Sequence, residues 1–120
     1  IDAQGIESLS KSVLAYEPVW AISNGNDFAN HATPTPHDAS IAAQAIRSQV
    51  KHLFGAKAAK SMRVMYGGSV TPDNTTGFMN AEGIDGLLVG GASLDVHTFT
   101  AIINKAQAAT SHSKMTKGKK

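Results

Sequence analysis

The chain has 120 residues, of which 42% are apolar and 17% are charged. This composition suits one folded domain and argues against a largely disordered protein. No apolar run approaches the ~18 residues of a membrane-spanning helix, and the opening residues lack the pattern of a secretory signal. Cysteine is absent, which excludes disulfides and thiolate metal sites.

The net charge of +2 arises from the end of the chain rather than from its body. Lys114, Lys117, Lys119 and Lys120 supply four of the eleven basic residues, and the remainder holds seven basic and nine acidic residues. Such a body has no basic face of the kind that binds nucleic acid. The five histidines show no metal-ligand spacing, so we expect neither nucleic acid nor a metal ion as a partner.

A short apolar run, a turn and a helical pattern follow one another three times along the chain. The apolar runs predict strands at Val13–Tyr16, Arg63–Tyr66 and Leu87–Val89. Short strands that alternate with helices indicate an α/β fold whose parallel sheet is buried on both faces. We therefore predict that residues 13–108 form three βα units, that residues 1–12 end a preceding element, and that residues 109–120 form a disordered basic tail.

The predicted helices have recognisable boundary residues. Thr35 and Pro36 open the first helix as cap and first residue, and Gly55 is placed to end it. Thr71–Pro72 open a shorter helix that runs to about Asn80. Apolar residues at helical spacing mark one face of each longer helix: Ala39, Ala42, Ala43, Ile46, Val50 and Leu53 in the first, and Val96, Phe99, Ile103 and Ala106 in the last.

Two double-glycine turns follow consecutive strands, Gly67-Gly68-Ser69 and Gly90-Gly91-Ala92-Ser93. Glycine lets the backbone approach a ligand closely, and each turn leads into a helix N-terminus whose N–H groups attract an anion. Because the carboxyl ends of parallel strands lie at one edge of a sheet, the two turns predict a shared phosphate site. Neither turn has the spacing of a nucleotide-binding loop, and the alternative is that both are only tight turns.

Glu17 follows the first strand, and the apolar segment Pro18–Ile22 follows Glu17 directly. A carboxylate at the end of a buried strand is half desolvated, which raises its proton affinity towards that of a useful base. The alternative for Glu17 is a structural salt bridge. The apolar segment is a candidate lid that excludes water from the site, and the alternative is a loop packed permanently on a helix.

The motifs of the three units resemble those of the triosephosphate isomerase family. The resemblance rests on Ala15-Tyr16-Glu17-Pro18-Val19-Trp20-Ala21-Ile22, Tyr66-Gly67-Gly68-Ser69-Val70 and Leu88-Val89-Gly90-Gly91-Ala92-Ser93-Leu94, which come in the family's order. It implies a partial (β/α)8 TIM barrel, made of the family's last three βα units, from a cytoplasmic homodimeric enzyme. Another phosphate-binding barrel would share the glycine turns, but the segment Tyr16–Trp20 argues against that alternative.

The resemblance also implies a reaction. The family interconverts dihydroxyacetone phosphate and D-glyceraldehyde 3-phosphate through an enediolate, without metal or organic cofactor, and is a well-known example of a glutamate base under a closing loop. By resemblance, Glu17 is the base, and the hydroxyl of Tyr66 latches the closed lid. The lid comprises Pro18, Val19, Trp20, Ala21 and Ile22, and the backbone N–H groups that hold the substrate phosphate are those of Ser23, Ser69, Gly90 and Gly91.

The chain departs from the family in what it lacks. A family barrel needs about 250 residues and eight strands. The family's lysine and asparagine after the first strand, and its histidine after the fourth, have no counterpart in this sequence. We therefore expect the chain alone to be inactive and to need the remaining barrel strands. The alternative is a non-catalytic barrel fragment that associates through its exposed strand edges.

The segment after the lid also departs from the family, with an apparent insertion at Asp27–Pro34. If Thr35–Pro36 matches the family's helix start, Pro34 takes the place of the N–H donor to the latch, and proline has no N–H. If Thr33–Pro34 matches it instead, Ala32 keeps that donor. In both cases we expect a lid with an altered C-terminal hinge.

Overall fold

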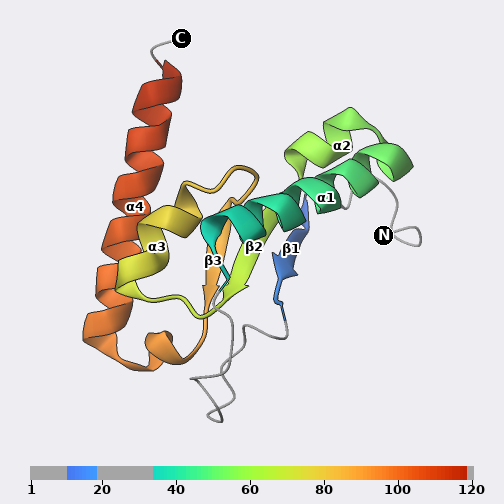
Figure 1. Cartoon of the computed structure of the whole chain (residues 1–120). Coiled ribbons are helices and arrows are strands. Elements are labelled where there is room, and N and C mark those ends of the chain that lie inside the picture. The colour runs from blue at the N-terminus through green and yellow to red at the C-terminus, as the bar shows by residue number, and fades with distance from the viewer. Residues whose placement is uncertain (1–10, 19–33, 119–120) are drawn as a thin grey trace.

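The computed structural model describes residues 11–18 and 34–118. A strand, a helix and a further strand alternate through these residues, with α1 crossing the sheet and α4 standing at its side (Figure 1). The predicted α/β order is confirmed. In chain order the elements are β1 (Val13–Tyr16), α1 (Pro36–Phe54), α2 (Ala56–Ser61), β2 (Arg63–Gly68), α3 (Pro72–Met79), β3 (Gly86–Val89), the 3₁₀ helix η4 (Gly91–Leu94) and α4 (Val96–Gly118).

The three strands form one parallel sheet in the order β1-β2-β3. Val13–Tyr16 pair with Arg63–Tyr66, and Met65–Gly68 pair with Gly86–Val89. Strand β2 extends through Gly68 because the two glycines, which we expected in a turn, pair with β3. Since all three strands run in one direction, their carboxyl ends lie at the same edge of the sheet, as predicted.

Helices α1 and α3 begin at the predicted residues, and each has the same reciprocal cap. Thr35 Oγ1 accepts a hydrogen bond from the N–H of Asp38 at 3.1 Å, and Asp38 Oδ2 accepts one from the N–H of Thr35 at 2.9 Å. The bond from the Thr35 N–H lowers the pKa of the Asp38 carboxyl. Thr71 and Asn74 make the equivalent bonds at 3.3 and 2.8 Å.

One face of the sheet is covered by helices, and the other is bare within the described residues. The core on the covered face gathers side chains from β2, α1 and α3: Val64, Tyr66, Ala39, Ala43 and Phe78. On the opposite face, which we call the open face, Val13 is 49% exposed and Leu88 is 44% exposed. The expectation of a sheet buried on both faces is therefore wrong for the described residues, because strand side chains alternate and helices pack on one side only.

Helix α4 differs from its prediction in length and in the face that it packs. It runs through Gly118, so helix replaces most of the disordered tail expected at residues 109–120. No proline or glycine precedes Gly118 within it to end the helix earlier. Ile102 and Ala109 are buried, whereas Ile103 and Val96 are 49% and 70% exposed, because α4 packs against α3 and η4 through the neighbouring stripe.

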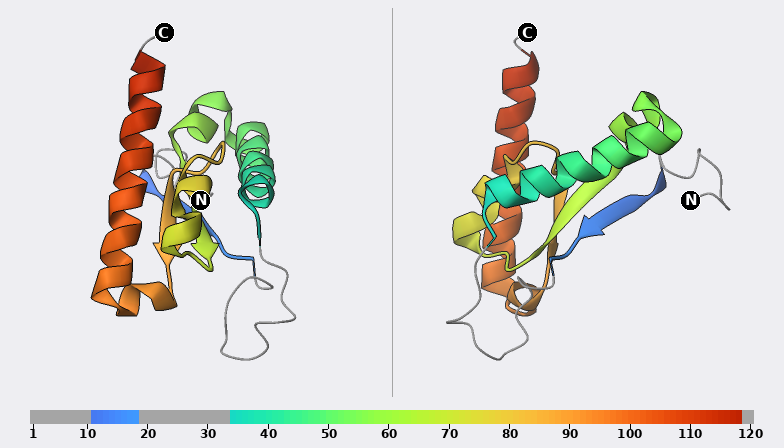
Figure 2. Two further views of the ribbon diagram at one scale, coloured as in Figure 1. Left: turned by 60° about the vertical axis from the view of Figure 1, so that its left-hand side comes forward. Right: turned by 45° about the vertical axis from the view of Figure 1, so that its right-hand side comes forward.

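The end of α1 also differs from its prediction. Leu53 is 66% exposed, although its spacing placed it on the packed face. The two views of Figure 2 show the C-terminal part of α1 reaching past the sheet to α2, which the sequence analysis did not predict. Gly55 separates the two helices with a φ of 98°, a left-handed value that favours glycine.

Among the described helices, we find no apolar stretch of the length that a membrane span requires.

Candidate active site

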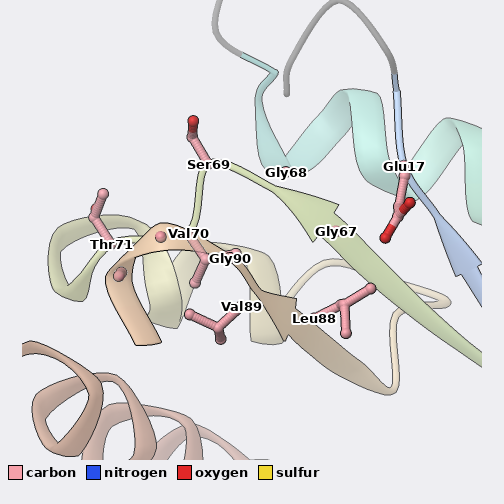
Figure 3. A pocket seen from close by; sticks show the side chains of 11 residues that line it. Glu17, Gly67, Gly68, Ser69, Val70, Thr71, Leu88, Val89 and Gly90 are labelled. Carbon is pink, nitrogen blue, oxygen red and sulfur yellow. The ribbon is translucent and has the colours of Figure 1, made fainter. Parts of the chain in front are cut away.

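A hollow of about 510 Å³ lies at the carboxyl ends of the three strands. All three βα units contribute to its wall (Figure 3). Glu17 comes from the end of β1, Ser69 from the segment after β2, and Gly90 and Gly91 from the turn after β3. The structure therefore brings together the residues that the sequence placed at one sheet edge.

The side chain of Glu17 leans across the end of β2 towards Gly67 (Figure 3). A Cβ atom placed on Gly67 would lie 2.9 Å from Glu17 Cγ and 3.2 Å from its Oε1. Glu17 is nevertheless exposed, so the half-desolvated carboxylate expected from the sequence is wrong for the described residues. The alternative of a structural salt bridge has no support either, since no described cation pairs with Glu17.

The two double-glycine motifs have different structural reasons. Gly67 and Gly68 belong to β2, and neither has a positive φ, so the tight-turn interpretation is wrong for this pair. Their missing side chains leave room for other residues, because a Cβ on Gly68 would collide with the hydroxyl of Tyr66. Around Gly90 and Gly91, by contrast, a Cβ would meet nothing within 4 Å. Side chains at these two positions would therefore point into open space, and both glycines line the hollow.

The backbone segments that border the hollow are fixed by hydrogen bonds from side chains. Asn74 Nδ2 donates to the carbonyl of Ser69 at 2.8 Å, so the α3 cap also holds the segment after β2. Ser93 donates to the carbonyl of Gly90 through its Oγ at 2.6 Å and through its N–H at 2.9 Å. Both carbonyls therefore have partners within their own βα unit.

Tyr66 lies beneath the site rather than in its wall. Its side chain is fully buried, and its ring stacks on Phe78 with centroids 4.1 Å apart and planes 7° apart. Among the described residues its hydroxyl has no hydrogen-bond partner. Burial, with smaller effects from Tyr16 and Asp38, raises the pKa of Tyr66 to about 12. A buried hydroxyl without a partner is unfavourable, so this group is a weak point of the core.

The raised pKa of Tyr66 predicts a loss of stability in alkali. In the unfolded chain the phenol releases its proton near its ordinary pKa of 10.0, whereas in the folded chain it holds the proton to about pH 12. The contribution to stability is therefore complete below pH 10 and lost as the pH rises to about 12. Titration of tyrosinate absorbance should show a late phase that Tyr66→Phe removes without lowering the melting temperature. A titration without that late phase would contradict the burial argument.

Most of the predicted lid lies outside the described residues. This applies to Val19, Trp20, Ala21 and Ile22, to Ser23, and to all of the apparent insertion except Pro34. Pro18 is described and is buried. Because α1 begins at Pro36 with Thr35 as its cap, the helix start at Thr35–Pro36 is confirmed, which leaves Pro34 directly before the cap.

Several residues of the hollow were not predicted from the sequence. Leu88 and Val89 of β3 line it, as do Val70 and Thr71 after β2. Val70, Leu88 and Val89 belong to motifs that we had interpreted through their neighbouring glycines, and Thr71 had been interpreted only as a helix cap. The alternation of side chains along a strand would place Leu88 beside Gly67 on the same face if the register of β2 and β3 were known. The sequence alone does not give that register.

No group of three His, Asp or Glu side chains suited to a metal ion occurs in the described part of the chain.

Comparison with known proteins identifies the family. The family model described as "Triosephosphate isomerase" matches residues 1–106. A relative of that name from Caldanaerobacter subterraneus subsp. tengcongensis is 48% identical over 98 residues, which cover 82% of this chain and 37% of the relative. One from Geobacter metallireducens is 50% identical over 96 residues, covering 80% and 36%. One from Cutibacterium acnes is 44% identical over 109 residues, covering 89% and 40%.

The chain thus spans less than half the length of these curated relatives. The match extends over all three described βα units as far as residue 106, well into α4. The parallel α/β arrangement accordingly represents part of a (β/α)8 barrel. This chain belongs to the triosephosphate isomerase family.

Proposed function

We propose that this chain supplies the base and part of the phosphate site of a triose-phosphate isomerase. The observation that carries the proposal is the shared hollow, which is lined by Glu17 at the end of β1 and by Gly90 and Gly91 at the end of β3, on either side of β2. The names of the relatives support the substrate, a small phosphorylated triose. The name of the relatives also supplies the reaction, an isomerisation, and the hollow agrees with it because a carboxylate that can accept a proton shares the hollow with backbone amide groups that suit a phosphate.

In the proposed reaction Glu17 moves a proton between two neighbouring carbons. Its carboxylate takes a proton from the hydroxymethyl carbon of dihydroxyacetone phosphate, which leaves an enediolate. It returns the proton to the next carbon, while a second proton moves between the two oxygens to give D-glyceraldehyde 3-phosphate. Protons balance and no electrons leave the substrate, so the proposed reaction needs no cofactor.

The remaining predicted residues belong to the same proposal. The backbone N–H groups of Ser69, Gly90 and Gly91, with that of Ser23, would hold the phosphate. Residues 18–22 would cover the site as a lid, with the hydroxyl of Tyr66 as its latch. Without a partner among the described residues, that hydroxyl is available for such a bond. Pro34 cannot serve as its donor, because proline has no N–H.

The proposed site needs groups that these residues do not provide. Of the described residues that line the hollow, none is a lysine or a histidine that could polarise the substrate carbonyl. We infer that further βα units supply these electrophiles. An electrophilic donor of this kind is typically worth about 10²–10³ in rate, so the chain alone should be inactive.

The open face of the sheet supports the need for further strands. Val13 and Leu88 are about half exposed on it, and β1 and β3 are the outer strands of the described sheet. Apolar side chains and unpaired strand edges favour association with additional strands. In a complete barrel these strands would close around the open face. The family's homodimer would then be a dimer of complete barrels.

Mixing the two parts of a barrel tests the proposal. We would combine the full chain with a polypeptide that carries the remaining βα units of the Caldanaerobacter relative, and we call this complex the completed barrel. Isomerisation of dihydroxyacetone phosphate should appear on mixing and from neither polypeptide alone. The control replaces the chain by its Glu17→Gln variant, which should assemble equally well and show almost no turnover.

The same experiment separates the proposed function from its alternative. A complex with a cooperative thermal transition but no isomerase activity would overturn the isomerase proposal. It would favour a non-catalytic fragment that acts only by association through its strand edges. The exposed Val13 and Leu88 support this alternative, because association would bury them.

A further inference from the structure

Gly67 and Gly68 occupy successive positions of β2 and therefore point to opposite faces of the sheet. Neither backbone conformation requires glycine, because among the described glycines only Gly55 and Gly83 have a positive φ. What the two positions share is a lack of space for a side chain. Glycine at these two positions is therefore explained by the space that it leaves and not by its backbone conformation.

On the covered face, the space over Gly68 belongs to Tyr66. A Cβ at Gly68 would lie 2.7 Å from Cζ of the Tyr66 ring, and that ring cannot move aside because it is stacked on Phe78. The Tyr66 ring, which fills this space, is part of the core. An alanine at this position would therefore disturb packing rather than the site.

On the open face, the space over Gly67 belongs to Glu17. The two positions lie side by side, since the neighbouring pair Tyr16 and Tyr66 is in register and Gly67 in turn pairs with Leu88. A Cβ at Gly67 would be 2.9 Å from Glu17 Cγ and 3.3 Å from Leu88 Cβ. Glycine therefore leaves a gap in this row of the sheet, and the Glu17 side chain leans into it (Figure 3).

The closest atom of Glu17 is Cγ, which determines how the contact could be relieved. A turn of the terminal carboxylate would leave Cγ where it is. Rotation about the Cα–Cβ bond moves Cγ, and it carries the whole carboxylate away from β2 and from the Gly90 turn beyond it. A methyl group at position 67 would thus change where the proton acceptor stands without removing it.

We propose that Gly67 is a positioning residue for Glu17: its missing side chain is the space that lets the carboxylate stand over the end of β2 and face the hollow. The functional part of this inference rests on the proposed isomerase activity. The steric part, a direct coupling between positions 67 and 17, does not.

The test compares Gly67→Ala with Gly86→Ala in the completed barrel. Gly86 pairs with Met65 on the same sheet, and a Cβ there would be 3.6 Å from Met65 Cγ, an ordinary contact. Gly67→Ala should lower kcat by about 10²-fold, the effect of a displacement of about 1 Å in a reacting group. KM and the affinity for inorganic phosphate should stay unchanged. Gly86→Ala should leave all three quantities unchanged.

A double-mutant cycle provides a measurement that does not depend on activity. Gly67→Ala should lower the urea midpoint of the completed barrel, and Glu17→Ala should make that loss smaller, because the contact with Cγ is then absent and only the contact with Leu88 Cβ remains. An equal loss in both backgrounds, or a Gly67→Ala enzyme with the kcat of Gly86→Ala, would overturn the inference. If the completed barrel has no isomerase activity, the proposed function fails while the cycle still decides the steric coupling.

Discussion

Glu17→Gln in the completed barrel should lower kcat by about 10²–10⁴-fold, the usual contribution of a positioned general base. Glutamine keeps the shape of the side chain and its contact with Gly67, so the substitution removes the proton acceptor and little else. KM and the affinity for inorganic phosphate should change little, because the proposed phosphate donors are backbone N–H groups of other residues. Steady-state kinetics in both directions of the isomerisation measure the effect.

Two further variants test whether the loss of kcat comes from the carboxylate of Glu17 and from its position. Glu82→Gln makes the same chemical change at an exposed carboxylate before the start of β3, at the other end of the strands, and should leave kcat unchanged. Glu17→Asp keeps the charge but withdraws the carboxylate by one methylene, and it should also lower kcat severely. A Glu17→Gln enzyme with near-normal turnover would show that Glu17 is not the base.

Arg47→Ala should give the largest loss of stability among the single substitutions considered. The Arg47 guanidinium donates to the carbonyls of Ala59, Met62 and Gly83 at 2.8, 2.9 and 2.9 Å and to Asp85 Oδ2 at 2.6 Å. Alanine would leave these acceptors without their partner. We expect a loss of about 2–4 kcal/mol in the free energy of unfolding, measured by urea denaturation of the completed barrel.

The position of Arg47 separates this stability effect from catalysis. Its partners precede β2 and β3, at the end of the sheet opposite the hollow. The kcat of the folded Arg47→Ala protein should therefore be unchanged. Arg47→Lys should recover only part of the stability, because an ammonium group cannot donate in the planar fork that three carbonyls and a carboxylate require. An unchanged urea midpoint in Arg47→Ala would contradict this account.

Features with a local cause were predictable from the sequence. Thr35 and Asp38 lie three residues apart, so their reciprocal cap is visible in the sequence before any folding. Gly55 ends α1 for an equally local reason, its left-handed φ. The meeting of Glu17 and the Gly90 turn was also predictable, because parallel strands bring their carboxyl ends together whatever their details.

Features decided by distant partners were not predictable in the same way. Arg47 donates hydrogen bonds to groups between 12 and 38 residues away, and no spacing in the sequence predicts these partners. Ile102 and Ile103 both fit a helical stripe, and only the position of α3 decides which of them is buried. The space over Gly67 depends on the pairing of β1 with β2, which the separate strand patterns leave open.

The register that pairs Tyr16 with Tyr66 has a consequence for how this sequence tolerates change in length. Successive side chains along a strand point to opposite faces of the sheet, so a shift of one residue moves a side chain to the other face. One residue inserted between Tyr16 and Glu17 would turn the carboxylate towards α1 and the core, although every residue of the motif would still be present. Insertions of two residues would preserve its orientation and move it further from the strand end. Lineages of this family should therefore accept length variation at the apparent insertion, Asp27–Pro34, far more readily than at the junction of β1 and Glu17.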